Sequence, residues 1–283
     1  MFAQCDAGFG GGSPRIGVRG GLIESGMTHT NLEKALSKVL IITGGSRGIG
    51  AATAVLAASH GYAVAVNYAA NSLAADDVVR QIREAGGTAM AVRADVGVEA
   101  DVLAMFQKVD AKLGRITALV NNAGVVDQVS RVDAMSIERL QRMFAINVFG
   151  SFMCAREAVK RMSTRYGGAG GNIVNVSSAA ARIGSPGQYV DYASAKGAID
   201  TFTMGLAKEV AAEGIRVNAV RPGIIETDIH ASGGLPNRAR DTAPQVPMQR
   251  AGTADEVAQA VLWLLSESSS YTTGSVVDVA GGR

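Results

Sequence analysis

Two tyrosines and one lysine stand close together in the stretch YVDYASAKGAID, residues 189–200. Tyr192 precedes Lys196 by four residues, so on a helix their side chains share a face, whereas Tyr189 has Ala193 at that spacing. A phenol with a pKa of about 10 is a poor acid or base at neutral pH, and a nearby ammonium lowers that pKa. The spacing therefore predicts that Tyr192 is a general acid–base and that Tyr189 packs or forms a wall of the substrate site.

A pair of serines, Ser177 and Ser178, ends the apolar run NIVNVSS that precedes this helix. Such a hydroxyl can donate a hydrogen bond to a carbonyl oxygen while Tyr192 protonates it. Serines at strand ends are more often turn formers or caps, so this role depends on a cofactor site nearby. With a hydride donor beside them, these groups could interconvert a ketone and a secondary alcohol, or a sugar and its lactone.

A glycine-rich stretch, TGGSRGIG at residues 43–50, supplies that cofactor site. It lies between an apolar run and a helical pattern, where a helix N-terminus offers unpaired N–H groups to a phosphate. Glycines allow the backbone to approach a pyrophosphate closely, and no Lys-Ser/Thr pair follows, which excludes a P-loop. The stretch predicts dinucleotide binding through Gly44, Ser46, Arg47, Gly48, Ile49 and Gly50.

The residue types around this loop favour NADP(H). The strand that follows ends in Asn67, where an acidic residue would hold the ribose hydroxyls of NAD. Arg47 within the loop offers a bidentate partner to a 2′-phosphate. Two later strand ends carry further cofactor candidates, Asp95 and Val96 in ADV and Asn122, Ala123 and Gly124 in NNAG.

Strand and helix patterns alternate along the chain, which predicts an α/β protein. We expect strands at 38–44, 62–68, 88–96, 116–124, 172–178, 215–222 and 275–281. We expect helices at 48–61, 72–87, 99–114, 136–166, 188–213 and 254–266. The resulting fold is a single Rossmann-type, doubly wound, seven-stranded parallel sheet with helices on both faces, and its ligands bind beyond the carboxyl ends of the strands.

Composition restricts the class of protein. The 283 residues carry a net charge of +2, two cysteines and three histidines, so nothing indicates nucleic acid, a disulfide framework or a metal site. No apolar run is long enough for a membrane span, and we expect a cytoplasmic protein. Residues 1–36 are predicted to be a flexible tail before a domain at 37–283. Within this domain a substrate lid is expected at about 225–247, with Ile229, His230 and Leu235 facing the substrate.

TGGSRGIG, NNAG, the serine after the fifth strand, Y-x-x-x-K and RPG, in this order, resemble the short-chain dehydrogenase/reductase family over residues 38–283. The resemblance implies that Ser178 orients the substrate, that Tyr192 is the acid–base, that Lys196 lowers its pKa and binds the nicotinamide ribose, and that Asn147 holds a relay water. It also implies cofactor contacts from Tyr192, Lys196, Pro222, Gly223, Ile225 and Thr227. A homotetramer built partly from the helices at 136–166 and 188–213 is a further implication.

The resemblance leaves the substrate open, with acyl-carrier-protein reductases and glucose dehydrogenases as similar members. Between Gln188 and Tyr192 the chain is one residue longer than many of those reductases, which makes Tyr189 an extra aromatic at the substrate mouth. The alternatives are a sugar dehydrogenase that uses NAD(H) or both cofactors, and a nucleotide-binding protein without turnover.

Overall fold

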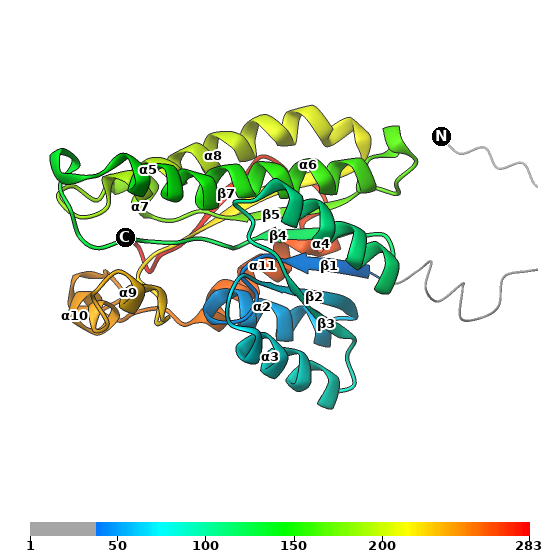
Figure 1. The fold of residues 1–283 in the computed structure, drawn as a ribbon, viewed down its shortest axis with the longest axis horizontal. Helices are drawn as coiled ribbons and strands as arrows, with labels where there is room; N and C mark the ends of the chain where they lie inside the picture. Colours follow the sequence, from blue (N-terminus) through cyan, green and yellow to red (C-terminus); the bar gives the residue numbers. More distant parts are fainter. Residues whose placement is uncertain (1–37) are drawn as a thin grey trace, which may run out of the picture.

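The computed structural model describes residues 38–283 (Figure 1). The tail predicted for residues 1–36 lies outside the described residues. None of the helices in the described part combines the length and the hydropathy that a membrane crossing requires. Between residues 38 and 283 no group of three or more His, Cys, Asp or Glu side chains could hold a metal ion.

As predicted, seven parallel strands form one sheet within these residues, and their order is β3-β2-β1-β4-β5-β6-β7. The order reverses between β1 and β4, where Leu40 of β1 pairs with Ala118 of β4 and with Val64 of β2. The crevice of a doubly wound sheet therefore opens beyond the carboxyl ends of β1 and β4. The strands are β1 Lys38–Ile42, β2 Tyr62–Tyr68, β3 Ala89–Arg93, β4 Ala118–Asn121, β5 Gly171–Val176, β6 Ile215–Pro222 and β7 Val276–Val279.

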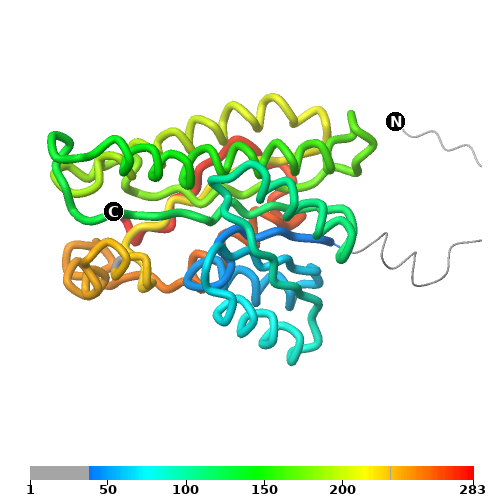
Figure 2. Tube along the Cα trace, viewed as in Figure 1, coloured from blue at the N-terminus to red at the C-terminus, as the bar shows by residue number. Residues whose placement is uncertain are grey.

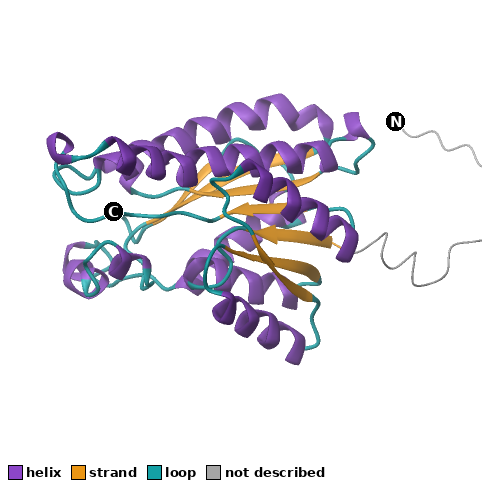
Figure 3. Cartoon of the chain, viewed as in Figure 1, coloured by secondary structure: helices purple, strands orange, loops and turns teal. Residues whose placement is uncertain are grey.

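Helices cover both faces of the sheet (Figure 3). Side chains of α2, α3 and α11 pack in one core cluster, and those of α4, α6 and α8 pack in another on the opposite face. The helices are α2 Gly48–Ser59, α3 Ser72–Glu84, α4 Glu99–Lys112, α5 Ile137–Phe144, α6 Gly150–Met162, α7 Ala180–Ile183, α8 Val190–Val210, α9 Ile229–Ser232, α10 Arg238–Thr242 and α11 Ala254–Leu265.

Strand β1 shows how the sequence positions the crevice. Leu40 and Ile42 belong to one cluster, whereas Val39 and Ile41 belong to the other, because successive side chains of a strand point to opposite faces. All four are at most 1 % exposed. Burial of each such side chain contributes about 1.5–3 kcal/mol, so a shift of register would be costly. The glycine-rich stretch after β1 is thereby held at the edge of the sheet.

The helical region predicted over 136–166 is confirmed over residues 137–162, but it is not one regular α-helix. It consists of α5, a π-helical segment Ala145–Phe149, α6, and a separate 3-10 turn Thr164–Tyr166. The helix predicted to 213 likewise ends as α8 at Val210 and continues as the 3-10 turn Ala211–Glu213. A π-turn widens the helix by one residue per turn, which the apolar spacing does not record.

The segment predicted as a lid lies beyond the strand ends. It contains α9, α10 and the 3-10 turn Ala243–Gln245, and Figure 2 shows it as a yellow-to-orange lobe near the end of the chain marked C. A backbone bridge between Ile225 and Gly252 fastens the two ends of this segment. Its short helices have little core of their own, which fits a covering role.

Candidate active site

The glycine-rich stretch is held on two sides by asparagine side chains. Asn67 Oδ1 accepts a hydrogen bond from Gly44 N at 3.1 Å. From the other side, Asn122 Nδ2 donates to the carbonyl oxygens of Thr43 and Gly44, both at 2.9 Å. Helix α2 then begins at Gly48, with no side-chain cap and no acidic residue in its first turn. Its first N–H groups therefore remain available for an anionic group such as a pyrophosphate.

Glycine is required at two positions of this loop. Gly48 has a φ of +53°, which side chains rarely adopt. A Cβ on Gly50 would lie 2.5 Å from Asn122 Nδ2 and closer still to the carbonyl oxygen of Gly44. The loop can therefore pack against the start of α2 only if residue 50 has no Cβ. It forms the base of a cavity of about 600 Å³ along the carboxyl ends of the strands, a volume and a donor set that fit a dinucleotide.

At one end of the cavity Arg47 is exposed, and within the described residues its guanidinium makes no hydrogen bond or ion pair. Asn67 borders the same end but is only 2 % exposed. Its Nδ2 donates to Ala94 O at 3.0 Å and to Val92 O at 3.3 Å, so the amide is engaged inside the protein. Asp95 lines this end too, with its Oδ1 accepting from Gly97 N at 2.9 Å.

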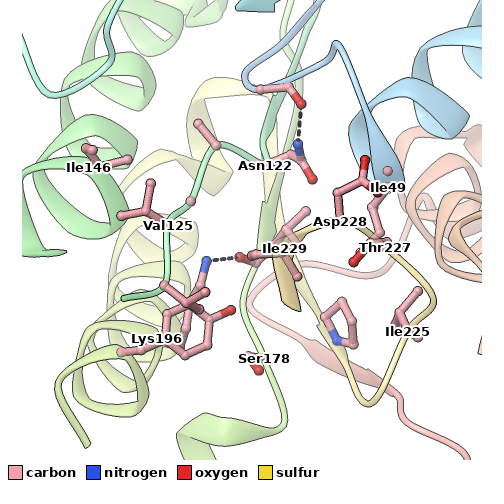
Figure 4. A pocket seen from close by; sticks show the side chains of 18 of the residues that line it. Ile49, Asn122, Val125, Ile146, Ser178, Lys196, Ile225, Thr227, Asp228 and Ile229 are labelled. Carbon is pink, nitrogen blue, oxygen red and sulfur yellow. Dashed lines mark hydrogen bonds between the residues drawn. The ribbon is translucent and has the colours of Figure 1, made fainter. Parts of the chain in front are cut away.

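At the other end the catalytic candidates meet. Ser178 follows β5, whereas Tyr192 and Lys196 lie on the first turns of α8, and all three line the cavity. Lys196 Nζ donates to the Val176 carbonyl at 2.7 Å, a bond visible in Figure 4, and lies 5.6 Å from the centre of the Tyr192 ring. Ser177 Oγ donates to the Lys196 carbonyl and is buried. Of the two serines, Ser177 therefore joins α8 to β5, whereas Ser178 Oγ accepts from Ala180 N at 3.1 Å and its hydroxyl lowers the pKa of the Tyr192 phenol.

The pKa values of this pair differ from the expectation that Lys196 lowers the pKa of the phenol. Burial raises the pKa of Tyr192 to about 12, and only the hydrogen bond with Ser178 opposes this rise. Burial also lowers the pKa of Lys196 to about 8, against an opposing effect of the Asp200 carboxylate. Loss of solvation is the largest effect on both pKa values, and the Lys196 ammonium donates to the Val176 carbonyl rather than to the phenol oxygen.

Asn147 acts behind the cavity wall. It lies in the π-helical segment and is fully buried, and its amide donates to the Met143 and Val125 carbonyls, both at 3.0 Å. Val125 N donates back to Asn147 Oδ1 at 3.2 Å. A Cβ on Gly124 would lie 2.8 Å from Asn147 Oδ1 and 3.6 Å from Lys196 Nζ, so these three residues meet. The relay water proposed for Asn147 stays a prediction.

The chain after β6 closes the cavity. Pro222, Gly223, Ile225 and Thr227 all line it, and the Thr227 methyl lies 3.2 Å from where a Cβ of Gly48 would be. Figure 4 shows Thr227 and Asp228 beside Ile49, with Ile229 extending into the middle of the pocket. The start of the lid segment therefore lies directly on the glycine loop.

Most predicted site residues lie together. All of them line the cavity except Gly50 and Asn147, which support it from behind. Of the residues expected on the lid, Ile229 lines the cavity and Leu235 does not, and the His230 side chain lies outside the described part. Sequence reasoning missed wall residues that no motif marks, namely Val125, Val126, Arg142, Ile146, Ile183, Arg238 and Arg283.

Comparison with known proteins agrees with this geometry. Residues 44–283 match the family model described as enoyl-(acyl carrier protein) reductase. An Escherichia coli protein named uncharacterized oxidoreductase YgfF is 56 % identical over 245 residues, which are 87 % of this chain and 99 % of that protein. A 3-oxoacyl-[acyl-carrier-protein] reductase of Synechocystis is 38 % identical over 247 residues, 87 % of this chain and 96 % of the relative. The solved short-chain dehydrogenase/reductase from Serratia marcescens superposes with a TM-score of 0.79 at 32 % identity, covering 87 % of this chain and 97 % of that one.

The fold and the site define an oxidoreductase with a dinucleotide cleft. The chain belongs to the short-chain dehydrogenase/reductase family, as the sequence motifs indicated. It is an enzyme that acts on CH–OH groups with NAD or NADP, so the alternative of a nucleotide-binding protein without turnover does not hold.

Proposed function

We propose that this enzyme interconverts a ketone and a secondary alcohol with NADP(H), using Tyr192 as the acid–base. The observation that carries the proposal is the meeting of Ser178, Tyr192 and Lys196 in the same cavity as the glycine loop. When bound, NADP(H) supplies or accepts the hydride. The residues of the chain bind the reactants and move the proton.

In the reduction direction, the raised pKa of Tyr192 keeps its phenol protonated at neutral pH, so it can donate a proton to the developing alkoxide. Ser178 lines the same cavity, and its hydroxyl, which lowers the pKa of the phenol, can donate a hydrogen bond to the same oxygen. With a pKa of about 8, Lys196 is mainly charged at pH 7. Its ammonium lies 5.6 Å from the centre of the Tyr192 ring, so a positive charge is close to the phenolate that is left once the proton has moved.

The NADP(H) preference is supported by charge at the Arg47 end of the cavity. Arg47 is exposed at the N-cap of α2, and its guanidinium makes no hydrogen bond or ion pair with other described residues. The Asn67 side chain brings no negative charge against a 2′-phosphate. A charge-assisted hydrogen bond of a guanidinium contributes about 1.5–3 kcal/mol, and about 1.4 kcal/mol is one decade in kcat/KM.

The test is the oxidation of NADPH and NADH with one ketone found in a substrate screen. We expect at least a tenfold higher kcat/KM with NADPH, and Arg47→Ala should remove most of it through KM, because the phosphate lies far from the hydride. Arg80→Ala, an exposed arginine paired with Asp77 on α3, is the matched control. Equal kcat/KM values with both cofactors would refute the preference and favour dual specificity.

We also propose that the enzyme is a homotetramer and that it lies in the cytoplasm. Large apolar side chains are exposed along the α5–α6 helices and α8, including Phe149 (57 %), Phe152 (46 %) and Met204 (43 %). Such a face is typical of a subunit interface. A cytoplasmic location is consistent with Cys154, a buried free thiol.

A further inference from the structure

More basic than acidic side chains line the cavity. Its acidic members are Asp95 and Asp228, whereas its basic members are Arg47, Arg142, Lys196, Arg238 and Arg283. Both acidic side chains belong to the cofactor end, since Asp95 follows β3 and Asp228 follows Thr227, whose methyl lies 3.2 Å from where a Cβ of Gly48 would be. Among the residues that line the cavity, the end that is left for the substrate therefore carries cations and no acidic side chain.

Arg238 is held at this end by neutral groups. Its Nη1 donates to Gln188 Oε1 at 2.9 Å, and its guanidinium lies over the Tyr189 ring, 5.2 Å from the centre. The Tyr189 hydroxyl donates in turn to the Gly233 carbonyl at 3.3 Å. Among the described residues no carboxylate pairs with Arg238, although its neighbour Arg240 on the same helix pairs with Asp241 at 3.2 Å. An arginine fixed in this way, half-buried and without a counter-ion, is prepared for an anion.

Two other arginines strengthen the positive potential. Arg283 Nη1 is buried and has no hydrogen-bond partner in the described part of the chain. Arg142 is only loosely paired, with its Nη1 3.8 Å from Asp127 Oδ2. Apolar side chains line the cavity as well, among them Val125, Val126, Ile183 and Ile229, and Val126 lies near the Tyr189 hydroxyl, since both would lie within 3.1 Å of a Cβ on Gly233.

Tyr189 is the N-cap residue of α8, three residues before Tyr192, which corresponds to about 4.5 Å along the axis at ~1.5 Å per residue. The guanidinium above the Tyr189 ring is therefore separated from the reacting carbonyl by several bonds of substrate. We propose that the substrate is a ketone or secondary alcohol with an apolar middle and an anionic group, a carboxylate or a phosphate, which Arg238 binds. This inference rests on the proposed function and names its substrate class.

The kinetic test compares an acid with its neutral ester. 4-Oxocyclohexanecarboxylate should be reduced with a kcat/KM at least about tenfold above that of its methyl ester. For a phosphate group, the corresponding comparison is the kcat/KM of dihydroxyacetone phosphate with that of dihydroxyacetone. Arg238→Gln should raise KM for the preferred acid about tenfold (~1.4 kcal/mol), leave kcat and the neutral ketone unchanged, and be partly rescued by Arg238→Lys. Arg240→Gln is the control and should change neither.

Equal losses for charged and neutral ketones in Arg238→Gln would overturn the proposal and assign Arg238 to holding the lid segment through Tyr189 and Gln188. A wild type that prefers neither anion over its neutral counterpart would overturn the proposal as well. Turnover of neutral ketones would in that case leave the proposed function standing.

A binding measurement tests the proposal even without turnover. Isothermal titration of cyclohexanecarboxylate, which has no carbonyl to reduce, and of inorganic phosphate into the NADP-loaded protein should give binding of at least one anion that Arg238→Gln weakens about tenfold. Arg240→Gln should bind as the wild type does. Affinity for both anions that is the same with and without Arg238, or no binding of either, would overturn the proposal.

Discussion

Replacement of Asn67 by aspartate should destabilise the protein rather than convert it to NADH. The Asn67 side chain is 2 % exposed, and its Nδ2 donates to the carbonyls of Val92 and Ala94 at 3.3 and 3.0 Å. A carboxylate has no donor, so it would leave both carbonyls facing a buried negative charge. A buried charge without a partner costs about 3–5 kcal/mol. At about 2–4 °C per kcal/mol for a chain of this size, Tm should fall by roughly 6–20 °C.

The assay is thermal unfolding of Asn67→Asp between pH 5 and pH 8. Burial raises the pKa of the introduced carboxyl above that of the unfolded chain, so the folded state binds more protons and the loss of stability should grow as the pH rises. Asn71→Asp is the matched control, because Asn71 caps α3 by accepting from Ala74 N and aspartate caps equally well. A Tm for Asn67→Asp within about 2 °C of the wild type, together with a swing toward NADH, would refute the reasoning.

Three other perturbations test the site and the assembly. Gly50→Ala should abolish NADPH binding in a fluorescence titration, because its Cβ would clash with the backbone of the glycine-rich loop. Gly197→Ala is the control and should bind normally, because nothing lies within 4 Å of its Cβ. Normal binding by both variants would contradict the assignment of the glycine-rich loop to the cofactor. Burial lowers the pKa of Lys196 from 10.5 to about 8, so between pH 8 and 10.5 the folded state binds fewer protons than the unfolded chain. In denaturant unfolding, the stability of the wild type relative to Lys196→Met should therefore rise by about 3 kcal/mol over this range. Parallel pH profiles of the two proteins would show that burial does not lower the pKa of Lys196. Phe149→Glu with Phe152→Glu should lower the mass seen by light scattering, since both rings are exposed on the single subunit, and a wild-type monomer at micromolar concentration would refute the tetramer.

The fold could be predicted because its determinants are local. The buried strand β1 carries the unbroken apolar run VLII, and the motif residues follow strand ends, so the topology alone brings Gly44, Ser178 and Tyr192 to one edge. The π-helical segment Ala145–Phe149 could not be predicted in this way, because it is accompanied by tertiary contacts of Asn147 with Val125 that the apolar spacing does not reveal.

The site was predicted where a motif exists and missed where only packing decides. Asn67 lines the cavity as predicted, but no motif shows that its amide also joins the glycine loop to the end of β3. No spacing rule connects Arg238 with Tyr189, because the two are 49 positions apart and meet only through the fold of the lid segment. The pKa of Tyr192 also depends on burial, which the i, i+4 relation to Lys196 does not reveal.

The most direct test of Tyr192 as the acid–base compares Tyr192→Phe with Tyr189→Phe in a single turnover of bound NADPH with an active ketone. Tyr192→Phe should slow NADPH oxidation by at least ~10²-fold, the usual scale for loss of a general acid, while the Kd for NADPH stays within about twofold. Tyr189→Phe keeps the ring under Arg238 and loses only the hydrogen bond to Gly233, so it should retain most of the rate. Equal losses in the two variants, or full activity of Tyr192→Phe, would contradict the assignment of Tyr192 as the acid–base.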